Sequence, residues 1–145
     1  MARHPRRRYH DPVKVFLVDD EDEVRPRLAH ALSELSGVHV YAAASRAGDV
    51  LRRITRSKPD VAVVDMRLHE GGALDLMRRI KAMPWAPVVI AISTSHSIAY
   101  RSSCQKAGAD FFFDKVHEQD RLIEVLTQLV EELRCKRQNA QITKK

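Results

Sequence analysis

Short apolar runs alternate with longer segments of helical periodicity along most of this chain. The runs are rich in β-branched residues, as expected for strands buried on both faces. They are Val13–Val18, Val38–Ala42, Asp60–Asp65, Val88–Ser93 and Asp110–Phe113. Strict alternation of strands and helices is typical of right-handed βαβ units, which form a parallel sheet covered by helices on both faces. We therefore expect an α/β fold with a five-stranded, doubly wound parallel sheet.

Five helices are predicted around these strands. The first carries an apolar stripe from Val24 to Leu35 and ends at Gly37. The next three cover about residues 47–54, 72–83 and 98–107, and each is followed by a proline or a glycine. The fifth repeats leucine and valine at helical spacing from Leu122 to about Arg134. We expect a domain over residues 13–134, a disordered basic tail over 1–12 and a polar basic tail over 135–145.

Composition narrows the class of protein. With 145 residues, 44% of them hydrophobic and 30% charged, the chain has the size and composition of one globular domain. Its two cysteines form no CxxC pair and no zinc-type cluster, which favours a reduced, cytoplasmic setting. No segment approaches the apolar length of a membrane span, and no apolar region follows the first arginines as in a secretion signal.

The net charge of +6 is unevenly distributed. Residues 1–14 carry +4 and residues 134–145 carry +5, so residues 15–133 are at −3. One hypothesis is therefore a binding module that uses its basic tails on nucleic acid. Because Tyr9 is the only aromatic residue in either tail and no nucleic-acid motif is formed, solvated disorder is favoured.

Aspartates, a serine and a lysine stand at the carboxyl ends of the predicted strands. They are Asp19 and Asp20 after the first strand, Asp65 at the end of the third, Ser93 at the end of the fourth and Lys115 after the fifth. The carboxyl ends of parallel strands form the usual binding edge of an open sheet. Crowded carboxylates repel one another unless a cation intervenes, and oxygen ligands without histidine or cysteine favour Mg²⁺. A lysine and a hydroxyl nearby suit a phosphoryl group.

The segments that carry these residues resemble the receiver domain of two-component response regulators. The resemblance covers Val13–Leu133 and depends on four segments in the family's order and spacing: Val15–Glu21, Asp60–Leu68, Ala86–Ser93 and Ala107–Lys115. It implies a flavodoxin-like (βα)5 fold and a phosphoacceptor signalling domain, with slow self-catalysed phosphorylation and dephosphorylation in place of an enzyme's turnover. Because only about a dozen residues follow the fifth helix, we expect a stand-alone, single-domain response regulator.

The resemblance also implies roles for individual residues. Asp65 would accept the phosphoryl group from a phosphohistidine, and Mg²⁺ would be held by Asp19, Asp20, Asp65 and the backbone carbonyl of Arg67. Ser93 and Lys115 would contact the phosphoryl oxygens. Phe112 falls at the family's switch aromatic, although plain core packing explains it equally well. Phe111 and Phe113 point to the opposite face and are expected in the core.

The implied partners follow from the same resemblance. The donor would be a sensor histidine kinase or a histidine phosphotransfer protein. A downstream protein target would bind at the surface of the fourth helix, fifth strand and fifth helix, and a second copy of the chain would bind on phosphorylation.

The sequence departs from the family pattern at two prolines. The family's proline after the lysine is replaced by Val116, and the proline in the loop after the phosphoacceptor strand is replaced by His69. A cis bond before Val116 would cost about 3 kcal/mol, so the geometry of that loop is left open.

An enzymatic alternative has a different nucleophile. The segment Asp20–Val24 fits the DxDxV pattern of haloacid-dehalogenase-like phosphatases, in which Asp20 would be phosphorylated and Asp22 would act as acid and base. This alternative leaves Asp19 unexplained, and the chain is short for such an enzyme. No glycine-rich nucleotide-binding motif follows the first strand.

Overall fold

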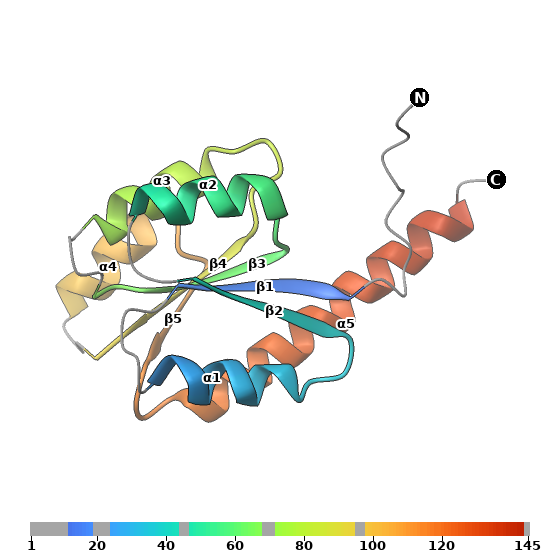
Figure 1. The fold of residues 1–145 in the computed structure, drawn as a ribbon, viewed down its shortest axis with the longest axis horizontal. Coiled ribbons are helices and arrows are strands. Elements are labelled where there is room, and N and C mark those ends of the chain that lie inside the picture. Colours follow the sequence, from blue (N-terminus) through green and yellow to red (C-terminus); the bar gives the residue numbers. More distant parts are fainter. Residues whose placement is uncertain (1–11, 19–23, 44–46, 68–71, 95–97, 144–145) are drawn as a thin grey trace.

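The computed structural model describes residues 12–18, 24–43, 47–67, 72–94 and 98–143 (Figure 1). Strands and helices alternate along the chain as β1 (Val13–Val18), α1 (Val24–Ser33), β2 (Val38–Ala43), α2 (Ala47–Ser57), β3 (Val61–Asp65), α3 (Ala73–Lys81), β4 (Val88–Ser93), α4 (Ile98–Lys106), β5 (Phe111–Asp114) and α5 (Gln119–Thr143). All strand pairs are parallel, in the order β2-β1-β3-β4-β5. The predicted doubly wound α/β fold is confirmed.

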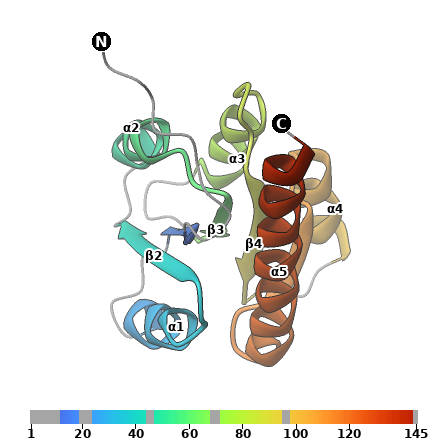
Figure 2. The same cartoon turned by 90° about the vertical axis from the view of Figure 1, so that its right-hand side faces the viewer.

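Apolar cores cover both faces of the sheet (Figures 1 and 2). On one face, strand residues pack with Leu32 of α1 and with Leu122 and Leu126 of α5. On the other face, they pack with α2, α3 and α4, which contribute Ile54, Met77 and Cys104 among others. The central strand β3 is buried along its whole length, which explains its continuous apolar run.

The end of α5 differs from the prediction. The apolar spacing predicts an end near Arg134, but the helix continues to Thr143. The added residues include neither glycine nor proline, so nothing in the sequence stops the helix. Moreover, Arg137 is paired with Asp60 at 2.8 Å between Nη2 and Oδ2, with both side chains about nine-tenths buried. Residues 135–143 of the predicted polar tail therefore belong to a helix that contacts the domain, while residues 1–11 lie outside the described part of the chain.

Two smaller predictions are corrected at element ends. Phe111 was expected in the core, but it is 37% exposed because β5 is an edge strand whose outer side has no neighbouring strand in the described structure. Phe113, in contrast, is buried as predicted. Gly72 does not begin α3 but caps it, with a left-handed φ of 80° that glycine adopts without strain.

The strand order identifies the edge of the sheet at which a ligand is expected to bind. The chain reverses its direction of winding between β1 and β3, and ligands of such folds bind beyond the carboxyl ends of the strands at this point. Strands β3, β4 and β5 all end at this edge, where their last residues are Asp65, Ser93 and Asp114.

Among the described helices, none is long and apolar enough to cross a bilayer.

Candidate functional site

Buried polar residues gather at the carboxyl edge of the sheet. Among the described residues, the buried polar or charged side chains are Asp65, Ser93, Asp114 and Lys115, each at most 3% exposed. All of them end strands β3, β4 and β5 or directly follow one. Because burial of charged groups is costly, such a cluster at a binding edge indicates a functional site.

An ion pair between Asp65 and Lys115 forms the centre of this cluster. The Lys115 Nζ contacts Asp65 Oδ2, and both side chains are 1% exposed. The second carboxylate oxygen, Oδ1, accepts the backbone N–H of Arg67 at 2.9 Å. The lysine thus holds a positive charge beside the carboxylate, where an incoming phosphoryl group would add negative charge.

Ser93 ends β4, and this strand lies between β3, which ends at Asp65, and β5, which Lys115 follows. In the sheet register Asp65 is paired with Ile92, and Ser93 is paired with Asp114, the residue before Lys115. The Lys115 backbone N–H donates to the Ser93 carbonyl at 2.9 Å. The three residues predicted from strand ends, Asp65, Ser93 and Lys115, are therefore brought to one edge.

The predicted metal ligands are described in part. Asp19 and Asp20 lie outside the described residues, and within the described part no three histidine, cysteine or acidic side chains come together. Strand β1 ends at Val18, which is paired in register with Val64, the residue before Asp65. The buried Asp65 carboxylate, the backbone at Arg67 and an acidic sequence directly after β1 supply oxygen donors of the kind that Mg²⁺ prefers, so the donor chemistry fits this ion.

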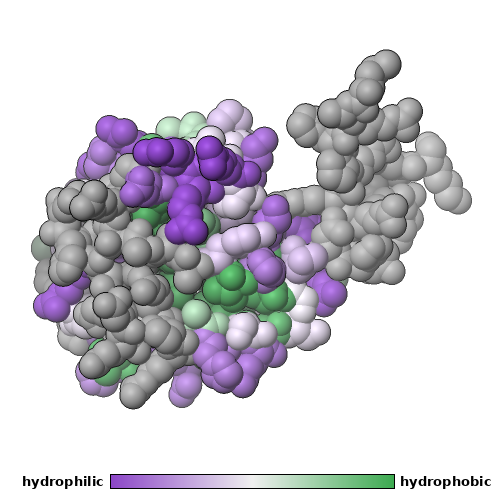
Figure 3. Space-filling view, in the orientation of Figure 1, coloured by the Kyte–Doolittle hydropathy of each residue, from purple (hydrophilic) through white to green (hydrophobic). Residues whose placement is uncertain are grey.

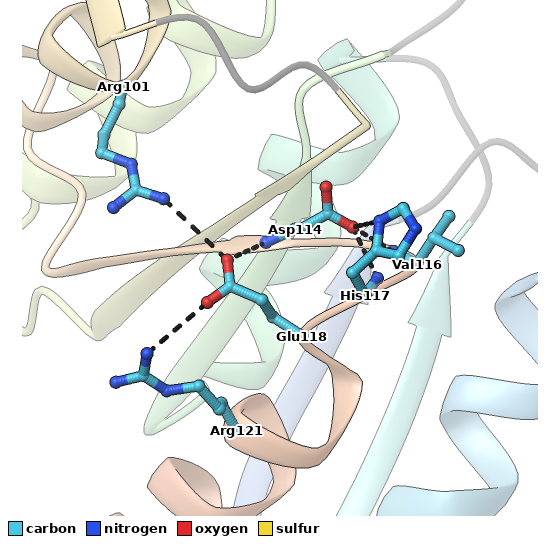
Figure 4. Close-up of polar contacts among 6 residues, drawn as sticks. All are labelled: Arg101, Asp114, Val116, His117, Glu118 and Arg121. Atoms are coloured by element: carbon cyan, nitrogen blue, oxygen red, sulfur yellow. Dashed lines mark hydrogen bonds and ion pairs between the residues drawn. The ribbon is translucent and has the colours of Figure 1, made fainter.

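The loop after β5 depends on a residue that sequence reasoning missed. Asp114 Oδ1 accepts the backbone N–H groups of Val116 at 2.8 Å and His117 at 2.6 Å, and it lies 3.1 Å from His117 Nδ1 (Figure 4). The Lys115–Val116 peptide bond is trans. Aspartate commonly bonds the backbone two residues onward, and this signal was available in the sequence. These bonds shape the turn where the family has a proline.

Aromatic residues connect helix α4 to the site. The Tyr100 hydroxyl donates to the Met66 carbonyl at 3.3 Å, directly after Asp65. Burial raises the pKa of Tyr100, and electrostatic interaction with Cys104 and Asp65 raises it further, while Arg67 lowers it. Phe112, the predicted switch aromatic, is partly buried, and the Arg101 guanidinium carbon lies 5.0 Å from the centre of its ring.

Comparisons with known proteins agree with this arrangement. The sequence model of the response regulator receiver domain matches residues 15–127. The response regulator GacA of Pseudomonas aeruginosa is 25% identical over 118 residues, which cover 81% of this chain and 55% of that protein. The DNA-binding transcriptional activator DevR/DosR of Mycobacterium tuberculosis is 39% identical over 66 residues, 46% of this chain and 30% of that protein. The chain thus spans about half the length of these curated relatives, or less.

Solved structures show the same fold. A CheY-like response regulator receiver domain protein from Methanospirillum hungatei superposes with a TM-score of 0.75 at 21% identity, covering 87% of this chain and 99% of that chain. Since the family model matches more than half of the sequence and the cluster of buried polar residues lies at the expected edge, this chain belongs to the response regulator receiver domain family.

Proposed function

We propose that Asp65 accepts a phosphoryl group from a phosphohistidine on a sensor histidine kinase or a histidine phosphotransfer protein. The observation that carries this proposal is the fully buried Asp65 carboxylate paired with the buried Lys115 at the binding edge of the sheet. In the transfer, an Asp65 oxygen forms a bond to phosphorus as the bond from phosphorus to the histidine nitrogen breaks. The electron pair of the broken bond stays on the imidazole, and Asp65 becomes an acyl phosphate.

Lys115 and Ser93 have separate roles in this proposal. The Lys115 ammonium offsets the charge that builds up on the phosphoryl oxygens, because it is held in a buried setting where electrostatic interactions are strong. The Ser93 hydroxyl donates a hydrogen bond to a phosphoryl oxygen once Asp65 is phosphorylated. Asp19, Asp20, Asp65 and the backbone carbonyl of Arg67 would hold Mg²⁺, which would neutralise part of the negative charge of the carboxylates and the phosphoryl group when bound.

The signal leaves through the surface of α4, β5 and α5. Glu118 links these elements, because its carboxylate accepts the Asp114 backbone N–H at 3.0 Å and lies 3.9 Å from Arg101 and 3.7 Å from Arg121 (Figure 4). Arg101 also covers Phe112, the proposed switch aromatic. The acyl phosphate adds negative charge beside Lys115, three residues before Glu118. The surface thereby changes its affinity for a downstream protein target or for a second copy of the chain, in the cytoplasm.

The test uses a small donor with a phosphorus–nitrogen bond. Purified protein is incubated with phosphoramidate and Mg²⁺, or with a chelator, and its intact mass is measured. The wild type gains one phosphoryl group only with Mg²⁺, and Asp65→Asn gains none. Asp75→Asn is the matched control, because Asp75 is exposed on α3 and pairs with Arg79 away from the site. An equal mass gain in Asp65→Asn, or no gain in the wild type, overturns the proposal.

A further inference from the structure

Strand β2 forms an open edge of the sheet, away from the phosphoacceptor and from the α4, β5 and α5 surface. It pairs with β1 on one side, and no strand of the described structure pairs with its other side. Val38, Val40 and Tyr41 of this strand are only partly buried. Figure 3 shows an apolar band over β2, between the hydrophilic surfaces of α2 above it and α1 below it. An open edge with apolar side chains is a template for an added strand.

A hollow of about 430 Å³ opens between this edge and helix α2. It is lined by Phe16, Val40, Tyr41, Arg53, Arg56 and Ser57. Phe16 and Tyr41 are paired in register on neighbouring strands, so their side chains share the face that lies under α2. Two aromatic side chains of the sheet therefore line one side of the hollow, and two arginines of α2 line the other side.

Two arginines give this hollow a positive charge. Arg53 and Arg56 are three residues apart on α2, which places them on one face of the helix. Both are exposed, and neither has an ion-pair partner among the residues that the structure describes, whereas their neighbour Arg52 pairs with Asp49. No acidic side chain of the described chain lines the hollow.

We propose that β2 and α2 bind an extended acidic peptide segment of a partner protein. The segment adds a strand to the free edge of β2, an apolar side chain enters the hollow over Phe16 and Tyr41, and a carboxylate two residues along the segment pairs with Arg53 and Arg56. Alternate residues of a strand point to the same face, so an apolar residue and an acidic residue at spacing two reach the hollow together.

A second copy of the chain fits the same edge less well. If β2 paired with β2 of a second copy, the two copies would be related by a twofold axis. Arg53 and Arg56 of the second copy would then lie near the same two arginines of the first copy. Like charges that approach across an interface are destabilising. An acidic segment has the complementary charge, and we therefore favour it over a dimer.

The test uses the isotope-labelled chain of 145 residues, to which a capped octapeptide is added stepwise. The peptide has threonine at every second position, and valine and glutamate alternate at the positions between. Binding should shift the amide resonances of β2 and weaken as salt is added. The variant Arg53→Glu/Arg56→Glu should bind about tenfold more weakly. The matched control, Arg78→Glu/Lys106→Glu, makes the same charge change at exposed positions of α3 and α4 and should bind as the wild type does.

Three results would overturn this inference. They are no binding of the peptide to the wild type at low salt, equal weakening in both double variants, and equal affinity for a peptide with lysine in place of glutamate. Concentration-dependent dimerisation that shifts the same β2 resonances without peptide would replace the acidic partner by a second copy. Because the titration needs no phosphoryl donor, its failure is distinct from failure of the phosphoacceptor proposal.

Discussion

At the scale of single residues, Tyr100 connects helix α4 to the loop that carries the phosphoacceptor chemistry. Its hydroxyl donates to the carbonyl of Met66, which stands between Asp65 and Arg67 in the chain. The raised pKa of Tyr100 means that this hydroxyl keeps its proton, and hence its role as donor, throughout the neutral pH range. Tyr100 is therefore a positioning residue for the backbone at the proposed metal and phosphoryl site.

Replacing Tyr100 by phenylalanine should lower the initial rate of phosphorylation about threefold to tenfold, because one hydrogen bond to the loop is lost. The rates are measured with phosphoramidate over a series of Mg²⁺ concentrations, and the loss should be largest at low Mg²⁺. Tyr41→Phe serves as the control, since Tyr41 lies on β2 away from the site. Thermal melts of both variants show whether they remain folded. Equal rates in Tyr100→Phe and the wild type would exclude the positioning role.

The two cysteines should differ in reactivity. Burial raises the pKa of the Cys104 thiol above its ordinary value of 9.0, whereas Cys135 is exposed. Iodoacetamide at pH 8 should therefore modify Cys135 first and Cys104 only after denaturation, as read by peptide mass spectrometry. Because the folded pKa lies above the unfolded pKa, the contribution of Cys104 to stability is complete below pH 9 and is lost as the pH rises further. Equal labelling of both thiols in the folded protein would contradict this account.

At the scale of elements, the periodicity of the sequence predicts the order and type of every strand and helix that the structure describes. The β-branched runs predict strands reliably, because the parallel strands are buried on both faces and apolar residues therefore occupy consecutive positions. The extension of α5 beyond Arg134 was missed because its residues are mostly polar and carry no apolar stripe. Its contact with the domain depends on Asp60, which is remote in sequence, and no local pattern reveals such a pair.

The Arg137–Asp60 pair should matter for stability. Replacing Arg137 by alanine removes the guanidinium that pairs with the largely buried Asp60 carboxylate, which also accepts the Lys14 backbone N–H. We expect the free energy of unfolding to fall by about 1–3 kcal/mol. The measurement is urea denaturation followed by fluorescence of Trp85, the single tryptophan, which lines the same hollow as Leu133 of α5.

Lys136→Ala is the matched control for this measurement, because Lys136 is an exposed neighbour on the same helix. Its effect should stay within about 0.5 kcal/mol. If the two variants unfold at the same urea concentration, the Arg137–Asp60 pair does not stabilise the domain.

At the scale of the whole molecule, the common location of Asp65, Ser93 and Lys115 could be predicted because the topology is regular. Strand ends far apart in the sequence meet at one edge of a parallel sheet, while the roles of these residues stay a proposal. The hydrogen bond of Tyr100 to Met66 could not be predicted in this way, since it depends on the packing of α4. The Asp114 turn has a local signal instead, because aspartate often bonds the backbone two residues onward. The stand-alone organisation of the chain stays a prediction.

The proposed phosphoacceptor is the Asp65 carboxylate. Borohydride reduces an aspartyl phosphate to homoserine, which tandem mass spectrometry locates in the sequence. After treatment with phosphoramidate and Mg²⁺, the wild type should contain homoserine at position 65, and a sample without the donor should contain none. Homoserine at position 20 would instead support the haloacid-dehalogenase-like alternative. Its absence from position 65 in protein that has gained a phosphoryl group would contradict the account.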